Sequence, residues 1–156
     1  MIHCTFENNN SALLRHAVVD TLVIRGEEIL LVKRTSKLLE GGKWALPGGY
    51  VEREETIYEA AEREILEETG WKVKDPYLLM VNSSPNRPKE DRQNIAFVLV
   101  YTATEKIGES DWESDEVKWF PIKGLTSKIN LAFDHAEDVN LYLKSKEQPL
   151  KLPVVV

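Results

Sequence analysis

The stretch that most constrains this chain runs from Leu46 to Trp71, where glutamate recurs at helical spacing. Glu64, Glu67 and Glu68 stand at positions i, i+3 and i+4, so a helix would carry all three on one face, with Cβ atoms about 5–6 Å apart. Like charges this close destabilise a helix unless a cation neutralises them or water solvates the face. Carboxylate oxygens suit Mg²⁺, Mn²⁺ or Ca²⁺. The stretch therefore predicts a helix whose acidic face binds a metal ion.

The ends of this predicted helix are marked in the sequence. Thr56, followed three residues later by Glu59, forms a capping box, and Gly70 is the expected residue after the last turn. Ahead of the helix, Pro47-Gly48-Gly49 permits a tight turn in which the backbone approaches a ligand closely. One loop and one helix could therefore supply a backbone carbonyl and several carboxylates to the same metal ion.

The same stretch resembles the Nudix box, G-x5-E-x7-R-E-U-x-E-E-x-G-U, in which U is a bulky aliphatic residue. Gly49 and Glu55 match its first two positions, and residues 63–71 match the remainder except at Trp71, which replaces an aliphatic residue. That exception concerns packing at the helix end rather than chemistry. A solvated, Glu-rich surface helix is the alternative, but the loop, the capping box and the spacing together favour the Nudix interpretation.

Length and composition indicate one ordinary globular domain over residues 1–156, with 42% hydrophobic and 29% charged residues. A net charge of −6 argues against nonspecific binding to a nucleic-acid polymer. The single cysteine, Cys4, excludes an intrachain disulfide and favours a reducing compartment. The first residues do not read as a signal peptide, and no apolar run reaches the length of a membrane span. We therefore expect a cytoplasmic protein without membrane association.

Strands dominate the remainder of the chain. Runs rich in β-branched and apolar residues predict strands over residues 15–24, 29–34, 44–46, 77–81, 94–104 and 117–121, the first two forming a hairpin. A second helix is expected over residues 134–143, with Asp134 and Glu137 forming a D-x-x-E capping pattern at its start. Residues 1–12 read as a polar lead, with a turn at the three asparagines. The pattern predicts an α+β or mixed α/β fold, and the resemblance implies an α/β/α sandwich around a mixed sheet.

The resemblance also implies a reaction and a set of site residues. Nudix proteins typically hydrolyse the pyrophosphate of a nucleoside diphosphate linked to another group, using a water activated by Mg²⁺ or Mn²⁺. Carried over by motif, the expected metal ligands are the carbonyl of Gly48 and the carboxylates of Glu64, Glu67 and Glu68. Arg63 and Glu55 are expected to pair and hold the loop against the helix.

The general base is variable in the family, and this sequence leaves it open. Either a box glutamate, Glu67 or Glu68, or a carboxylate from a later loop could take the role. The later candidates are Glu113, Asp115 and Glu116, of which Glu116 is the first choice. An acidic surface loop is the alternative explanation for this cluster.

Two segments bear on the substrate. The run Ser83-Ser84-Pro85-Asn86-Arg87, with Pro85 standing 15 residues after Gly70, resembles the S-x-P-N-R segment of ADP-ribose pyrophosphatases. The run 131–135 resembles the segment that opens the last helix in such enzymes. The expected substrate-binding residues are therefore Trp44, Pro85, Arg87, Phe133 and His135. Structural roles remain open: Arg87 as a solvated cation, Phe133 as a core residue and His135 as a surface residue.

Hydrolysis of ADP-ribose to AMP and ribose 5-phosphate is the expected reaction, and three alternatives stay open. The protein could act on a nucleoside triphosphate with an oxidised base, or on a nucleotide sugar or dinucleoside polyphosphate. It could also be a non-catalytic sensor of ADP-ribose, although the retained glutamates and the short segment after residue 143 favour an enzyme. The apolar tail, residues 148–156, could add an edge strand or pack on a second subunit, so a homodimer is possible.

Overall fold

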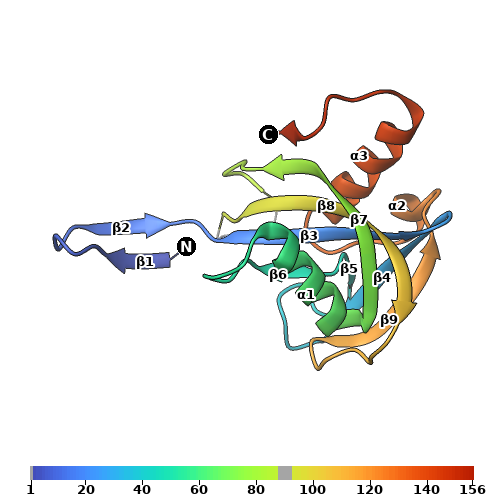
Figure 1. The fold of residues 1–156 in the computed structure, drawn as a ribbon, viewed down its shortest axis with the longest axis horizontal. Coiled ribbons are helices and arrows are strands. Elements are labelled where there is room, and N and C mark those ends of the chain that lie inside the picture. The colour runs from blue at the N-terminus through green and yellow to red at the C-terminus, as the bar shows by residue number, and fades with distance from the viewer. Residues whose placement is uncertain (1, 88–92) are drawn as a thin grey trace.

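A computed structural model describes residues 2–87 and 93–156 of the protein. Its main sheet is mixed, with strand order β10-β7-β8-β3-β4-β5, while β6 pairs with β3 and β9 pairs with β4 (Figure 1). The strands are β3 (Ala17–Arg25), β4 (Glu28–Arg34), β5 (Trp44–Ala45), β6 (Gly48–Tyr50), β7 (Trp71–Asn82), β8 (Ile95–Lys106), β9 (Ser114–Pro121) and β10 (Val154–Val155). β8 runs parallel to β3, whereas β3 and β4 form the predicted antiparallel hairpin. The predicted mixed sheet is thus confirmed.

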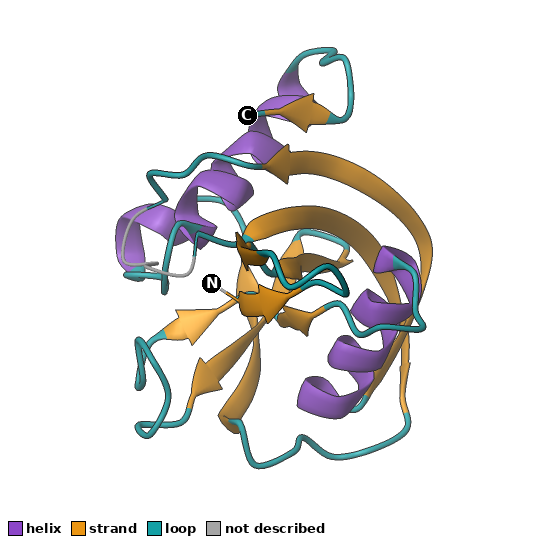
Figure 2. Cartoon of the chain, turned by 90° about the vertical axis from the view of Figure 1, so that its left-hand side faces the viewer, coloured by secondary structure: helices purple, strands orange, loops and turns teal. Residues whose placement is uncertain are grey.

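Helices cover both faces of this sheet. The helices are α1 (Ile57–Thr69), α2 (Leu125–Lys128) and α3 (His135–Glu147). In β3, Val19 and Val23 belong to the core cluster under α1, while Leu22 belongs to the cluster that contains residues of α3. This alternation follows from the strand's period of two, and it buries both faces. Figures 1 and 2 show α1 and α3 on opposite sides of the strands, as the predicted α/β/α sandwich requires.

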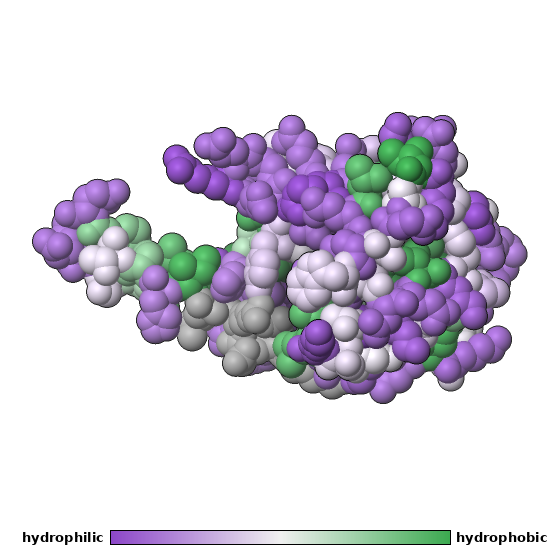
Figure 3. Space-filling view, turned by 90° about the horizontal axis from the view of Figure 1, so that it is seen from below, coloured by the Kyte–Doolittle hydropathy of each residue, from purple (hydrophilic) through white to green (hydrophobic). Residues whose placement is uncertain are grey.

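The N-terminal segment departs from the prediction. In place of an irregular lead, β1 (Ile2–Thr5) and β2 (Ser11–Leu14) form an antiparallel hairpin, with the asparagines in its turn. The hairpin projects from the body (Figure 1), and exposed apolar side chains lie on it (Figure 3). Those side chains are Ile2, Phe6, Leu13 and Leu14. Strands of four residues are too short to show a clear alternation, which explains why the sequence did not predict them.

Two other elements differ from the predicted ones, and a third agrees with its prediction. β7 is longer than expected, because register shifts between Lys74 and Tyr77 carry its pairing with β8 past a polar stretch. The glycine turn is a short strand, β6, paired with residues 18–20 of β3. The tail forms an edge strand, β10, parallel to β7, which confirms that expectation. Among the described residues, no helix is both long and apolar enough to span a bilayer. The last part of the predicted loop 83–91 lies outside the described residues.

Candidate active site

Two glycines allow the loop before α1 to press against its neighbours. A Cβ atom at Gly48 would overlap the backbone carbonyl of Val19, and a Cβ atom at Gly49 would overlap the carboxylate of Glu64. The hydroxyl of Thr21 donates to the carbonyl of Pro47 (2.7 Å), which fixes the loop on β3. Any larger side chain at either glycine would therefore push β6 away from the strand or displace Glu64.

The helix α1 has the predicted ends. Glu59 N–H donates to the hydroxyl of Thr56 (3.3 Å), and Thr56 N–H donates to the carboxylate of Glu59 (2.8 Å), which completes the capping box. Gly70 ends the helix in the left-handed conformation, with its N–H bonded to the carbonyl of Leu66 (2.8 Å). Because Ile65 and its neighbours anchor the opposite face in the core, the glutamate face is directed towards the glycine loop.

Glu64 and Glu68 both contact the glycine loop. Glu68 is 5% exposed, and its Oε2 accepts the N–H of Gly48 (3.0 Å). Burial raises the pKa of Glu68, and the nearby charges of Glu64 and Asp111 raise it further. Burial also raises the pKa of Glu64. Each carboxylate thus resists ionisation in this setting, and a bound cation would relieve that resistance.

Arg63 joins the loop after β6 to the helix. Its Nε and Nη2 donate to the two carboxylate oxygens of Glu55 (3.0 and 2.7 Å), and Nη2 also donates to the carbonyl of Tyr50 (3.1 Å). Nη1 donates to Glu64 (2.9 Å) and Glu67 (3.2 Å). A forked arginine–carboxylate pair of this kind fixes orientation as well as charge. The structure therefore brings Glu55 and Arg63 together behind the glutamate face.

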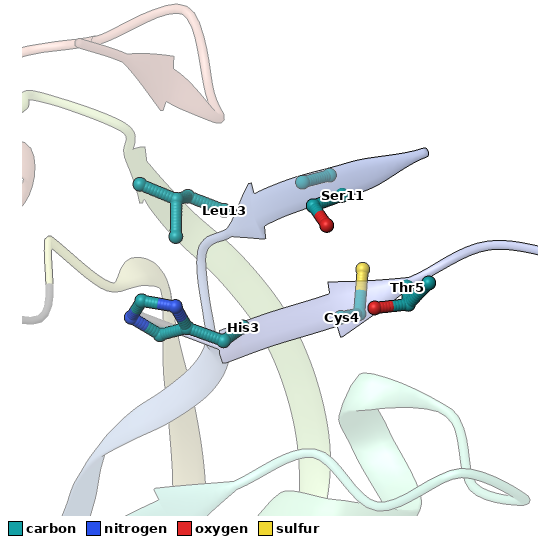
Figure 4. Close-up of a pocket in the computed structure, with 6 residues that line it drawn as sticks. His3, Cys4, Thr5, Ser11 and Leu13 are labelled. Atoms are coloured by element: carbon teal, nitrogen blue, oxygen red, sulfur yellow. The ribbon is translucent and has the colours of Figure 1, made fainter. Parts of the chain in front are cut away.

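A cavity of about 350 Å³ opens beside these carboxylates. Glu64, Gly48 and Gly49 line one side of it. The remaining lining comes from other elements: Val18, Asp20, Arg34, Leu38, Leu39, Leu46, Tyr50, Arg87, Asn94, Glu113, Phe133 and His135. A second hollow of about 370 Å³ lies along the N-terminal hairpin, lined by residues of β1 and β2 (Figure 4). We place the chemistry in the first cavity, because carboxylates and arginines converge there.

The wall opposite the box is a charged network. Asp134 accepts Nε and Nη2 of Arg87 (2.8 and 2.7 Å) and the amide nitrogen of Asn82 (3.2 Å). Nη2 of Arg87 also lies 3.5 Å from Asp20. Burial alone would lower the pKa of Arg87, but the bonds to Asp134 and the charge of Asp20 raise it above its usual value. The expectation that Asp134 caps the helix through its side chain is wrong, because Arg87 and Asn82 take its carboxylate.

His135 is buried in the same wall, and its hydrogen bonds determine which ring nitrogen carries the hydrogen. Its Nδ1 accepts the backbone N–H of Leu46 (2.9 Å), so the hydrogen must be on Nε2, which lies 3.4 Å from Asp20. Burial alone would raise the pKa of Asp20, but the hydrogen bond from His135 and the charge of Arg87 lower it. The structural alternative for His135, a surface position, is therefore wrong.

A family model described as the NUDIX domain matches residues 14–142. The chain belongs to the Nudix family. This assignment confirms the resemblance that the residues of the box predicted, and it covers the helix, the glycine loop and both walls of the cavity.

Several Nudix-related proteins are similar to this chain in sequence. It is 39% identical over 130 residues to an ADP-ribose pyrophosphatase of Methanocaldococcus jannaschii, covering 82% of this chain and 73% of that protein. It is 30% identical over 145 residues to the human 8-oxo-dGDP phosphatase NUDT18, covering 88% of this chain and 42% of that protein. The chain spans 31% to 43% of the length of four such relatives.

A solved structure gives a further comparison. The bifunctional NMN adenylyltransferase/ADP ribose pyrophosphatase of Francisella tularensis, complexed with AMP and a Mn ion, superposes with a TM-score of 0.69 at 26% identity. The match covers 86% of this chain and 42% of that one. The Nudix fold is therefore shared with a protein that binds an adenine nucleotide and a divalent metal.

The donor set of this Nudix site suits a divalent cation. Glu64 and Glu68 are one turn apart and touch the same glycine loop, so two carboxylates and one backbone carbonyl would supply hard oxygen ligands. Within residues 2–87 and 93–156, no three His, Cys, Asp or Glu side chains converge as a metal site by themselves. Glu67 is turned towards Arg63, and its side chain is 52% exposed.

The structure does not bring every predicted residue to the cavity. Glu116 is exposed on β9 opposite Lys33, whereas Glu113 lines the cavity, so Glu113 replaces Glu116 as the later-loop candidate. Trp44 packs edge-on against Phe120 (4.7 Å between centroids) and lies in the core rather than in the described cavity lining. Pro85 is exposed in the turn that precedes Arg87.

Several cavity residues were not predicted. Arg34 lies near Glu68, whose pKa its charge lowers, and its guanidinium is 5.1 Å from the ring centroid of Phe133. Asp20 is a buried carboxylate in the middle of the apolar strand β3. A lone aspartate within a run of β-branched residues is a signal that could have identified it, because burying a carboxylate requires partners. Arg34, which ends its strand, carries no comparable signal.

Proposed function

We propose that this Nudix pyrophosphohydrolase cleaves ADP-ribose to AMP and ribose 5-phosphate. The observation that carries the proposal is the 39% identity to an ADP-ribose pyrophosphatase over 82% of the chain. The cavity supports it, because carboxylates for metal binding stand at one side and cationic, aromatic and apolar groups line the others. A dinucleotide-like substrate has a charged diphosphate between two organic groups. Its site therefore needs charged groups for the diphosphate and apolar or aromatic groups for the ends.

Glu64, Glu68 and the carbonyl of Gly48 would hold the metal ion, with Mg²⁺ as the expected ion and Mn²⁺ as the alternative. When bound, such an ion neutralises a diphosphate and activates a water molecule for attack. Arg63 and Glu55 keep Glu64 and the loop in place through the forked pair described above. The role of Glu67 as a further ligand stays a prediction, since its side chain pairs with Arg63.

Glu113 is the carboxylate that we assign as general base in place of Glu116. It lines the same cavity as Glu64, and its charge contributes, after burial, to the raised pKa of Glu64. Its position is fixed by two backbone bonds: Thr35 N–H donates to its carbonyl (3.0 Å), and its own N–H donates to Asp111 (3.0 Å). A carboxylate held beside the metal ligands can accept the proton of an attacking water.

Arg34 supplies a positive charge between the carboxylates of the box and the ring of Phe133. Its Nε donates to the carbonyl of Leu39 (2.8 Å), which fixes the side chain while the guanidinium faces Phe133. A fixed arginine next to the carboxylates would attract and orient a phosphate. A cytoplasmic location and a homodimer remain predictions.

Product analysis with Mg²⁺ across a small panel tests this function. The panel contains ADP-ribose, a nucleotide sugar, a dinucleoside polyphosphate and an oxidised dGTP, with the Glu68→Gln protein as a blank. AMP and ribose 5-phosphate formed from ADP-ribose, at least tenfold faster than products of the others, is the expected result. Faster cleavage of another substrate would overturn the ADP-ribose assignment. Binding of ADP-ribose without turnover would show a sensor instead.

A further inference from the structure

Phe133 adopts a backbone conformation that an aromatic residue rarely occupies. Its φ angle is +51°, in the left-handed region, yet its side chain lines the cavity. Its ring faces the guanidinium of Arg34 at 5.1 Å and lies 5.4 Å from the ring of His135. A conformation of this kind persists only where the surroundings determine it. The residues on either side of Phe133 must therefore hold it.

Both neighbours of Phe133 are anchored to other elements. On one side, Ala132 N–H donates to the carbonyl of Trp44 (2.8 Å). On the other, the carboxylate of Asp134 is held by the fork of Arg87 and by Asn82, across 47 and 52 residues of sequence. The turn is thus fastened to β5 and to the end of β7.

The guanidinium of Arg87 is already paired with carboxylates of the protein. Its side chain is 6% exposed, and Nε and Nη2 are occupied by Asp134, with Asp20 at 3.5 Å. To bind a phosphate with the same nitrogens, the guanidinium would have to abandon a buried fork and leave Asp134 without its counter-charge, which is strongly unfavourable.

The ring of Phe133 shares the cavity with two leucine side chains. Leu38 and Leu39 line the same cavity, and Leu39 is 51% exposed. Arg34 links the two surfaces, since its Nε bonds Leu39 while its guanidinium faces Phe133. A flat aromatic ring beside leucines is a surface on which a nucleobase stacks, and stacking of this kind changes affinity on the order of tenfold or more.

Resting on the proposed function, we infer that Phe133 is the nucleobase platform and that Arg87 is a positioning residue acting through it. The Arg87–Asp134 fork fixes the turn that presents the ring, so the loop ending at Arg87 selects for a nucleotide without binding its phosphates.

A double-mutant cycle on AMP binding, read by calorimetry in Mg²⁺ buffer, tests the inference. Phe133→Ala, Arg87→Met and Asp134→Asn should each weaken AMP binding on the order of tenfold. The Phe133→Ala/Arg87→Met double variant should bind AMP as the Phe133→Ala variant does, because Arg87 acts through the ring. Binding of inorganic pyrophosphate should stay unchanged in all of them. Lys72→Met, which breaks an exposed pair with Glu105, is the matched control.

Two outcomes overturn the inference. If Arg87→Met weakens pyrophosphate binding while Asp134→Asn does not, Arg87 is a phosphate ligand. If the single effects multiply in the double variant, the two residues act independently. Arg87→Lys retains the charge without the fork and replaces Arg87→Met if that variant does not fold, as judged by circular dichroism. It should raise KM for ADP-ribose about tenfold with kcat within about threefold.

The same cycle separates this inference from the proposed function. AMP binding is read without turnover, so cleavage of another nucleotide would defeat the ADP-ribose assignment while the cycle still decides the role of Arg87. A wild-type protein that does not bind AMP would overturn the platform itself.

Discussion

Two acidic clusters differ in how their charges are paired: the box wall, formed by Glu64, Glu68 and the glycine loop, and the far wall, formed by Asp20, Arg87, Asp134 and His135. On the far wall, Asp20 and Asp134 face Arg87 and His135, which come from separate parts of the chain. On the box wall, Glu68 is similarly buried, and its carboxylate accepts a backbone N–H from Gly48. On the far wall, the guanidinium of Arg87 thus lies against two buried carboxylates. On the box wall, Arg63 pairs with Glu64 and Glu67, but none of the ion pairs among the described residues reaches the buried carboxylate of Glu68.

This difference indicates which carboxylates perform chemistry. A buried carboxylate that is forked to an arginine is held in one place and is poorly available to a ligand. A buried carboxylate whose pKa is raised by burial and by like charges gains most from a bound cation. We therefore propose that the box wall is the catalytic side and that the far wall positions the groups that select the substrate.

The largest expected effect is the fall in kcat in Glu68→Gln, which removes a charge from the box wall. The amide cannot supply the negative charge that the box wall offers to a cation, so we expect kcat to fall about a thousandfold, equivalent to about 4 kcal/mol. Glu62→Gln, on an exposed position of the same helix, should leave kcat within about twofold. Steady-state kinetics with ADP-ribose measures both. Near-normal turnover by Glu68→Gln would remove the basis for a catalytic wall.

Glu113→Gln and Glu116→Gln form the next pair. If Glu113 completes the catalytic side as general base, its amide should lower kcat about a hundredfold, or about 2.7 kcal/mol. Glu116 is exposed on β9, so its amide should change kcat less than about twofold. Steady-state kinetics with ADP-ribose measures both variants. The reverse pattern would restore Glu116 as the base.

The box wall could be predicted from sequence because its information is local. The glutamates, the capping box and Gly70 all lie within one helix, so their spacing alone places them on a common face. The family assignment follows from the same short stretch. Its glycines could also be recognised, although their close contact with Val19 required the pairing of β6 with β3.

On the far wall, Arg87, Phe133 and His135 line the cavity as the sequence predicted, but their contacts could not be predicted because they join distant segments. Arg87 meets Asp134 across 47 residues and Leu46 meets His135 across 89 residues. Asp134 looks like a helix cap in sequence, and only the fold shows that Arg87 takes its carboxylate. Glu116 was misplaced for a related reason. The sequence predicts a strand only over residues 117–121, whereas β9 starts at Ser114, so the exposed position of Glu116 on that strand could not be recognised.

Asp138→Asn tests the far wall through stability. Asp138 is 1% exposed, and within the described part of the chain its Oδ2 has no hydrogen-bond partner. Burial, followed by the charges of Asp20 and Asp134, raises the pKa of Asp138 well above its usual value. A folded-state pKa above the unfolded one of about 3.9 contributes stability that is complete below that value and is lost as pH rises through the folded pKa.

We therefore expect Asp138→Asn to stabilise the protein by about 1–2 kcal/mol at pH 8, with the gain shrinking towards pH 4. For a chain of this size that raises Tm by about 2–6 °C. Asp134→Asn is the contrast, since it removes a paired carboxylate and should lower Tm. Thermal unfolding from pH 4 to pH 8 measures both variants. A loss of stability in Asp138→Asn would mean that Asp138 is ionised and paired, so the far wall would hold more counter-charge than we assign.

The smallest expected effect is the stabilisation of the folded protein by Mg²⁺. A ligand at about five times its Kd stabilises the state that binds it by about 1 kcal/mol, so Tm should rise by about 2–4 °C between EDTA and Mg²⁺ buffers. Glu68→Gln should abolish this rise because it removes charge from the box wall, while Asp138→Asn should keep it because Asp138 is not among the described residues that line the cavity. An equal rise in Glu68→Gln would place the ion elsewhere. The box wall would then lack the open negative charge that distinguishes it from the wall it faces.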